Sequence, residues 1–210
     1  MTYDYPDAVR PDILRMIPAD GLVIGSVGCG RGATEALLVA QGREVHGVDV
    51  APEAIEQAMH RITSPRVVDP GERAPFAPAS LDGLILADVL EHLTGAGEAL
   101  ASFAAAVKPG GWIAISVPNM RNAEVIARFV ISGDWPEETT GIFDRTHVQI
   151  MSRKRLERWC LAAGLRPESW FDCYDPNGPR RHRFFRTLDR LTFRCFHHLL
   201  MYELQVLCRR

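Results

Sequence analysis

Three glycines are the first residues in this chain whose type and spacing suggest chemistry. Gly28, Gly30 and Gly32 fall within five positions of VIGSVGCGRGATEALL, between an apolar run and a run of helix formers. Glycine costs conformational entropy, so its use there predicts a tight turn or a bound group that approaches the backbone. A helix that begins at such a turn favours an anionic group, because its first N–H groups are unpaired.

Two aspartates end the next two predicted strands. Asp49 lies near the end of EVHGVDV, and Asp69 ends RVVD. Ligands of open α/β sheets bind beyond the carboxyl ends of the strands, near the first crossover. A carboxylate accepts several hydrogen bonds and donates none, so Asp49 is placed to bind both hydroxyls of a ribose. Asp69 is placed to accept from the exocyclic amine of an adenine.

A second group of polar residues follows a later strand. Asp88, Glu91 and His92 lie within about one helical turn, so their side chains can converge at the ligand edge of the sheet. His147, in FDRTHVQ, is placed to reach the same edge from a loop. Imidazole changes charge near neutral pH, so His147 is a candidate general base, with His92 and Asp144 as further candidate catalytic residues. The alternative is a purely structural pairing of His147 with Asp144.

The elements that must position these residues alternate between strand and helix. We predict helices at 9–17, 33–41, 51–62, 89–107, 122–131, 152–164 and 184–199, with KPGG (108–111) as a turn. We predict strands at 22–27, 44–50, 66–69, 81–88, 112–118, 165–172 and 201–208. Apolar strands separated by helices imply a doubly wound α/β fold, with a parallel sheet covered by helices on both faces.

Composition narrows the class of protein. The 210 residues are 47% hydrophobic and 24% charged, typical of one globular domain, and no apolar stretch is long enough to span a membrane. The first residues are acidic where a signal peptide would be basic and then apolar, so we expect a cytoplasmic protein. A net charge of −2 argues against DNA as a partner.

Four segments together resemble the class I S-adenosylmethionine-dependent methyltransferases over about residues 8–172. They are VGCGRG, GVDVAPEAIEQA, APFAPASLDGLILADVLEHL and KPGGWIAISVPN. The resemblance implies a Rossmann-like, seven-stranded, mostly parallel sheet with an antiparallel last strand, and S-adenosylmethionine as cofactor. It implies that the glycines face the methionine part of the cofactor, Asp49 the ribose and Asp69 the adenine. The cofactor-binding residues expected on this basis are Gly28, Cys29, Gly30, Gly32, Asp49, Val50, Asp69, Asp88 and Val89.

One position departs from that family. An acid usually stands two residues before the first glycine and helps to hold the methionine end of the cofactor, but this chain has Ser26. Either the cofactor is bound more weakly, or another acid takes that place.

The second polar group is similar to the divalent-metal site of small-RNA 2′-O-methyltransferases, and its ExxEH part also resembles ubiquinone-pathway O-methyltransferases. The resemblance implies Asp88, Glu91, His92 and His147 as ligands of a divalent ion that binds an acceptor hydroxyl. The loop with DRTH resembles bacterial enzymes that modify cell-envelope glycans or lipid-linked sugars. We therefore expect O-methylation of a small-molecule or sugar- or lipid-linked hydroxyl. Trp135, Phe143 and Arg145 are candidates to line its pocket.

Two other functions remain open. Gly28, Gly30 and Ala33 also satisfy the GxGxxG/A pattern of dinucleotide-binding proteins, with an acid about twenty residues further on, so an NAD(P)-dependent oxidoreductase is the first alternative. Ser26 favours the second, an S-adenosylmethionine-binding regulator without turnover.

The end of the chain is basic. Six arginines and one acid lie from Arg180 to Arg194, in the predicted loop at 173–183 and the predicted amphipathic helix at 184–199. Such a helix suits peripheral contact with an anionic membrane through 183–199, or the face of a homodimer. We expect one domain over 1–210, with a cofactor-binding core at 8–172 and substrate-binding or capping insertions at 132–150 and 173–199.

Overall fold

The computed structural model describes residues 7–68, 75–175 and 178–210. The strands are β1 Val23–Val27, β2 Glu44–Asp49, β3 Ser64–Val67, β4 Leu81–Ala87, β5 Val107–Pro118, β6 Arg166–Cys173 and β7 Glu203–Arg209. The helices are α1 Pro11–Leu14, α2 Ala33–Val39, α3 Pro52–Ala58, the 3₁₀ turn η1 Leu90–His92, α4 Ala96–Ala106, α5 Ala123–Ser132, α6 Arg153–Ala162, α7 Pro179–Leu191 and α8 His197–Leu200.

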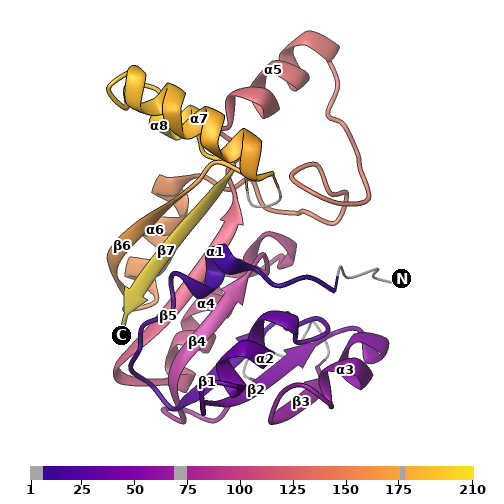
Figure 1. The fold of residues 1–210 in the computed structure, drawn as a ribbon, viewed down its shortest axis with the longest axis vertical. Helices are drawn as coiled ribbons and strands as arrows, with labels where there is room; N and C mark the ends of the chain where they lie inside the picture. The colour runs from indigo at the N-terminus through magenta and orange to yellow at the C-terminus, as the bar shows by residue number, and fades with distance from the viewer. Residues whose placement is uncertain (1–6, 69–74, 176–177) are drawn as a thin grey trace.

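The strands form one twisted sheet in the order β3-β2-β1-β4-β5-β7-β6 (Figure 1). β1 to β5 are parallel, whereas β7 lies between β5 and β6 and is antiparallel to both. The predicted Rossmann-like, seven-stranded sheet with an antiparallel last strand is confirmed. Because β7 runs against its neighbours, its first residue lies at the same edge as the last residues of β4 and β5, and Glu203 pairs with Pro118.

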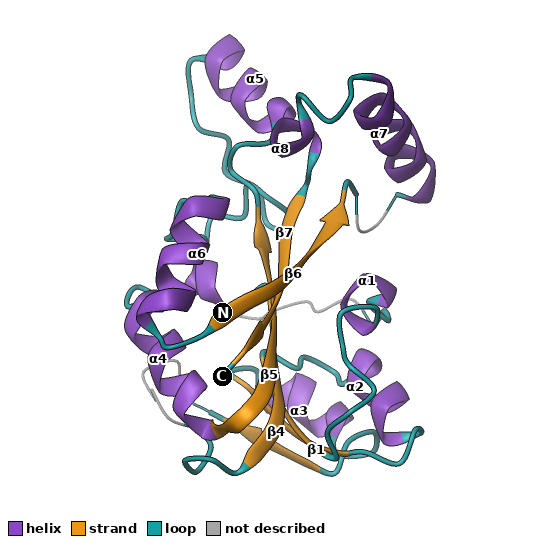
Figure 2. Ribbon diagram, turned by 90° about the vertical axis from the view of Figure 1, so that its left-hand side faces the viewer, coloured by secondary structure: helices purple, strands orange, loops and turns teal. Residues whose placement is uncertain are grey.

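Two apolar layers cover the sheet. On one face, side chains of α4 and α6 such as Leu100, Phe103 and Leu156 pack against β4, β5 and β7. On the other, α1, α2 and α3 pack around Ile24 and Trp112. The two groups of helices flank the sheet in Figure 2. Burial of both faces explains why the parallel strands are continuous apolar runs.

The predicted helix over 89–107 is broken into η1 and α4. Leu93 is extended, with φ −95° and ψ 125°, and α4 begins only after Gly95. A residue distant in the sequence stabilises this break, because the side-chain amide of Gln149 donates to the carbonyls of Leu93 and Thr94 at 2.8 and 3.0 Å. These carbonyls have no helical partner, and Gln149 satisfies them.

Other element boundaries also differ from the prediction, most clearly at β5 and α7. KPGG is not a turn but belongs to β5, which pairs with β4 across a register shift between Leu81 and Gly83. The predicted helix over 184–199 begins earlier, at Pro179, where proline suits the first turn. It ends at Leu191, because left-handed conformations at Phe193 and Arg194 separate α7 from α8. In the described part of the chain, no helix is both long and apolar enough to cross a membrane.

Candidate active site

The glycine loop has the backbone that its composition predicts. Gly28, Gly30 and Gly32 all have left-handed conformations, with φ of +69°, +51° and +72°. A Cβ atom on Gly28 would lie 2.8 Å from Cγ2 of Val89, so a side chain there would require movement at the end of β4. The amide of Gly28 donates to the carbonyl of Val48 at 2.8 Å, which fixes the loop against β2. The loop therefore presents bare backbone at the carboxyl edge of the sheet.

Asp49 lies beside this loop and is buried. Its Oδ2 accepts from the amide of Gly30 at 2.8 Å, and its Oδ1 accepts from the amide of Ala51 at 3.0 Å. Cys29 is also buried next to it, while Val50 is exposed beyond the strand. Asp69 lies outside the described residues.

Ser26 supports a second buried acid beneath the loop. Its hydroxyl donates to Oε1 of Glu35, in the first turn of α2, at 2.8 Å. Burial is the main cause that raises the pKa of Glu35, and the negative charge of Asp49 adds to it. Among the described residues, no lysine, arginine or histidine pairs with Glu35. A carboxyl group from the helix thus lies next to Ser26, the strand position at which the resemblance led us to expect an acid.

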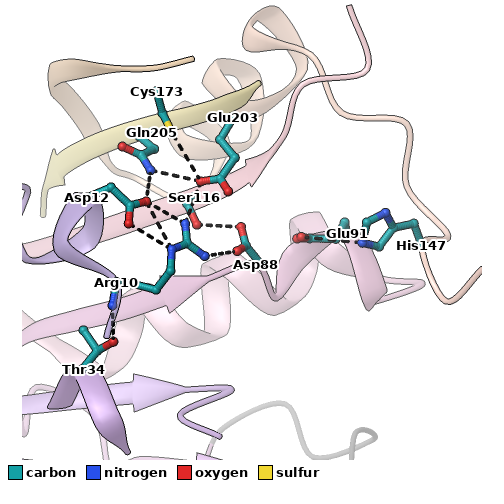
Figure 3. Close-up of polar contacts among 10 residues, drawn as sticks. All are labelled: Arg10, Asp12, Thr34, Asp88, Glu91, Ser116, His147, Cys173, Glu203 and Gln205. Carbon is teal, nitrogen blue, oxygen red and sulfur yellow. Dashed lines mark hydrogen bonds and ion pairs between the residues drawn. The ribbon is translucent and has the colours of Figure 1, made fainter. Parts of the chain in front are cut away.

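At the end of β4, Asp88 is directed away from the residues expected to be its co-ligands. Its carboxylate accepts from Arg10 at 2.6 Å and from the Ser116 hydroxyl at 2.7 Å. Figure 3 shows it pointing toward Arg10, while Glu91 and His147 face each other further along the chain. Asp88 also has a left-handed backbone, with φ +54°. The structure therefore does not bring Asp88 into the predicted four-residue metal site.

Arg10 joins three carboxylates from three parts of the chain. Besides Asp88, it donates to Asp12 at 2.7 Å and to Glu203, the first residue of β7, at 2.8 Å. We call these four residues the Arg10 network. Burial, followed by the charge of Asp88, raises the pKa of Glu203 to about 8. The backbone amide of Arg10 also donates to the Thr34 hydroxyl at 3.0 Å, so the segment before α1 spans from α2 to β7 (Figure 3).

Glu91, His92 and His147 form a separate group, called here the acid–imidazole cluster. One ligand atom from each lies within 4.8 Å of the others. Nε2 of His147 is 4.0 Å from Oε1 of Glu91, and the rings of His92 and His147 meet edge to face at 4.8 Å between centroids. Glu91 is fully buried, and neither of its carboxylate oxygens has a hydrogen-bond partner among the described residues. Such a group calls for a proton, an ion or a ligand.

Long-range hydrogen bonds bring His147 to this place. The amides of Val148 and Gln149 donate to the backbone carbonyl of Glu91 at 2.8 and 3.1 Å. Nδ1 of His147 faces the carbonyl of Ile142 at 3.3 Å, and because a carbonyl only accepts, that nitrogen carries the proton. Nε2 is then left with its lone pair. Burial, followed by the charge of His92, lowers the pKa of His147 and favours this neutral form.

Asp144 acts on His92 through a threonine. Its Oδ1 accepts from the amide and hydroxyl of Thr146 at 2.8 and 2.6 Å. The Thr146 oxygen then accepts from Nδ1 of His92 at 2.9 Å, so in the neutral ring Nε2 is the nitrogen with the free lone pair. Burial raises the pKa of Asp144, but the Thr146 bonds outweigh it and hold that pKa below its usual value. Of the alternative pairing of His147 with Asp144, the structure shows a backbone bond from the His147 amide to the Asp144 carbonyl at 3.0 Å, while the Asp144 side chain binds Thr146.

Trp135 and Phe143 lie together beside α5, whereas the nearby Arg145 is exposed. The Trp135 ring packs edge to face against Phe143 at 5.2 Å and against Phe129 at 5.8 Å between centroids. Phe143 is buried in a small apolar cluster with Val125 and Ile142. Trp135 remains partly exposed and is the better placed of the two to contact another molecule.

Sequence reasoning did not single out Arg10, Glu35 or Glu203. An arginine near the start of a chain and a glutamate in a helix are ordinary, and no local pattern marks them. Glu35 had an indirect signal, since Ser26 left open which acid serves the glycine loop.

Comparison with solved structures identifies the class of fold. The chain superimposes on an S-adenosylmethionine-dependent methyltransferase from Archaeoglobus fulgidus with a TM-score of 0.69 and 19% identity, covering 96% of this chain and 92% of the other. A second such enzyme, from Mesorhizobium loti, gives 0.67 and 16% identity, with 95% and 96% covered. At these identities the likeness shows the fold, which is that of the S-adenosylmethionine-dependent methyltransferases.

Sequence comparison then identifies the family. The chain belongs to the methyltransferase domain family, whose profile matches residues 2–169. It is 27% identical over 153 residues to a ubiquinone biosynthesis O-methyltransferase from Leptothrix cholodnii, covering 70% of this chain and 65% of that protein. A protein of the same name from Burkholderia lata is 32% identical over 152 residues, covering 62% and 66%. The chain thus aligns with about two thirds of the length of these relatives. None of these findings supports the oxidoreductase alternative.

Proposed function

We propose that this methyltransferase transfers the methyl group of S-adenosylmethionine to a hydroxyl group of a small or lipid-linked acceptor. The observation that supports it best is the acid–imidazole cluster, in which two imidazoles present unprotonated Nε2 atoms beside a buried, unsatisfied Glu91. A hydroxyl acceptor must lose a proton, and groups of this kind can accept it. The name of the relatives, O-methyltransferase, points in the same direction.

The glycine-loop end suits the cofactor. Three left-handed glycines leave room against the backbone, and the carboxylates of Glu35 and Asp49 provide negative charge for a cationic sulfonium compound. We assign the methionine part to the glycines and Cys29, and the ribose to Asp49 and Val50. Val89 and Asp88 border the cofactor at the end of β4, and Asp69 remains the proposed adenine ligand.

The acid–imidazole cluster also suits a divalent metal ion. Two neutral imidazole nitrogens and one carboxylate form a typical ligand set, and the partner of each Nδ1–H holds its ring in place as outer hydrogen bonds do in metal sites. A bound ion lowers the pKa of a hydroxyl that it contacts. We therefore propose Glu91, His92 and His147 as its ligands. Asp88, which is held by Arg10, is not included.

The chain's own residues supply the rest of the reaction. Transfer from a sulfonium is an in-line displacement, so holding the acceptor oxygen on the axis of the methyl group accounts for much of the rate. Nε2 of His147 cannot hold an ion and a proton at once. In the reaction without an ion, the acceptor proton passes to this nitrogen, and the adjacent Glu91 carboxylate stabilises the imidazolium that forms. Thr146 and Asp144 keep His92 oriented throughout.

The experiment measures S-adenosylhomocysteine formed from S-adenosylmethionine with a panel of phenols, sugars and polyprenyl-linked sugars. We expect turnover that a chelator reduces by roughly a hundredfold or more, and Mn²⁺ binding detected by electron paramagnetic resonance. His147→Gln should abolish both and leave cofactor affinity unchanged. His60→Gln, at an exposed histidine at the end of α3, is the matched control.

Each part of the proposal can fail separately. Full turnover in the presence of a chelator would exclude the metal ion from the proposal and leave His147 as a general base. Cofactor binding with no acceptor consumed would favour the non-catalytic regulator. No binding of S-adenosylmethionine to the wild-type protein would overturn the proposal as a whole.

A further inference from the structure

The C-terminal helices carry large apolar side chains that no other part of the described protein covers. Phe184 and Leu191, seven residues apart and so on one side of α7, are both exposed, Leu191 by 72%. In the connection to α8, Phe193 is 91% exposed and Phe196 is also exposed. We call these four residues, with the neighbouring Arg180, Arg183, Arg186 and Arg190, the α7 face.

The fold does not need the α7 face for its own packing. A neighbouring side of α7 holds Phe185 and Leu188, which pack against Tyr174 and Met201. Asp189, also on that side, is fully buried and accepts from the Tyr174 hydroxyl at 2.7 Å. The helix is therefore already anchored to the rest of the protein, and its exposed apolar residues are not needed to hold it in place.

The connection after α7 presents its phenyl groups outward. Phe193 and Arg194 have left-handed backbones, with φ of +50° and +60°. That conformation is costly for a bulky residue, and the side chain of Phe193 is almost fully exposed to solvent. Arg194 is held there by the carboxylate of Asp172 at 3.1 Å. An unfavourable conformation that exposes an aromatic ring indicates a role in contact with something else.

The same end of the molecule carries a second apolar surface on α5. Phe129, Val130 and Ile131 are exposed, Ile131 by 84%. Figures 1 and 2 place α5 with α7 and α8 beyond the carboxyl ends of the central strands, and Arg181 of α7 pairs with Glu124 of α5 at 2.7 Å. The helices that carry these exposed apolar residues thus lie at the end of the sheet at which the candidate site lies.

The positive charge of α7 indicates that the partner of the α7 face is anionic. Residues 180–194 contain six arginines, and their one acid, Asp189, is buried. Arg180, Arg183, Arg186 and Arg190 form no ion pair with any described residue. Apolar side chains bordered by unpaired arginines suit a surface that is anionic outside and apolar beneath.

We propose that the α7 face docks peripherally on an anionic phospholipid membrane, with Phe193 and Phe196 inserted between the headgroups and the arginines paired with phosphate. This goes beyond methyl transfer, and it requires no turnover. It would hold the carboxyl edge of the sheet near a membrane, where a lipid-linked acceptor is found.

The test is co-sedimentation of the full-length protein with vesicles. One set contains phosphatidylglycerol and phosphatidylcholine in equal parts, and the other contains phosphatidylcholine alone. We expect binding to the anionic set that is tighter by roughly tenfold or more and that weakens at high salt. Phe193→Ser with Phe196→Ser should weaken it roughly tenfold. Arg183→Gln, Arg186→Gln and Arg190→Gln together should weaken it by roughly a hundredfold.

The control variant carries Leu22→Ser and Met59→Ser, two exposed apolar residues on the β1 and α3 side of the molecule. It should bind vesicles as the wild type does. Equal binding to both vesicle sets, or equal loss in the control and α7-face variants, would overturn the proposal. So would a dimer, seen by analytical ultracentrifugation, that the Phe193→Ser, Phe196→Ser variant dissociates while vesicles fail to bind.

Discussion

The acidic side chains at the two ends of the site differ in whether a positively charged residue of the protein compensates their charge. At the glycine loop, Glu35 is buried with a serine hydroxyl and no basic partner among the described residues. At the β4 and β7 end, Asp12, Asp88 and Glu203 share the guanidinium of Arg10. A buried acid without a cation is costly unless it is protonated or a cation arrives. The first end is therefore suited to receive a cationic ligand, whereas the second supplies its own counter-charge.

Removing that counter-charge should have the largest effect. Arg10→Gln leaves the carboxylates of Asp12 and Asp88, and the carboxyl group of Glu203, without a cation. We expect the free energy of unfolding to fall by about 3–5 kcal/mol. Lys108→Gln, which breaks the exposed pair with Asp82, should cost less than about 1 kcal/mol. Urea denaturation at neutral pH measures both. Similar losses in the two variants would mean that the Arg10 network contributes no more than a surface pair.

The same network should make stability depend on pH. With a folded pKa of about 8, Glu203 keeps a proton that the unfolded chain has already released. The contribution of Glu203 to the free energy of unfolding is therefore complete below the ordinary pKa of a glutamate. It is lost as the pH rises toward and through the pKa of Glu203 in the folded protein, at up to about 1.4 kcal/mol per pH unit. Relative to Glu203→Gln, the wild type should lose stability between pH 5 and 8 in urea titrations. Parallel curves for the two proteins would contradict this.

The same contrast explains which parts of the molecule could be predicted. The glycine loop, Asp49 and the sheet follow from local patterns, because apolar runs, glycines and strand-end acids reveal themselves within a few residues. The Arg10 network does not, since Arg10 and Glu203 are 193 residues apart. The break at Leu93 also depends on a distant residue, Gln149.

The sequence spacing did not predict the direction of the Asp88 side chain. It placed Asp88 beside Glu91, but Arg10 and Ser116 hold its carboxylate in another direction. The acid–imidazole cluster was expected from Glu91, His92 and His147, yet the bonds that place His147 run through backbone atoms that no motif records.

At the glycine-loop end, backbone geometry should matter more than charge. Gly28→Ala forces alanine into a left-handed conformation and puts its Cβ 2.8 Å from Val89, so we expect a loss of about 2 kcal/mol in stability and weaker cofactor binding. Gly42→Ala, at φ +85° with nothing within 4 Å of a Cβ, carries the backbone strain alone. Thermal unfolding and calorimetric titration with S-adenosylmethionine compare them. Gly42→Ala should bind the cofactor normally, and equal cofactor affinities in both variants would exclude close approach at Gly28.

The smallest expected effect tests whether Glu35 takes the role of the acid that is expected at position 26, where this chain has a serine. Glu35→Gln keeps an oxygen for the Ser26 hydroxyl and removes the charge, so S-adenosylmethionine and S-adenosylhomocysteine should each bind about tenfold more weakly, a typical value for one lost charged interaction. Methylthioadenosine, which has no ammonium group, should bind unchanged. Adding Ser26→Asp returns an acid to β1 and should restore most of the affinity. A variant that weakens all three ligands equally would instead assign Glu35 to the support of the loop, since only a carboxylate that faces the ammonium group can distinguish among them.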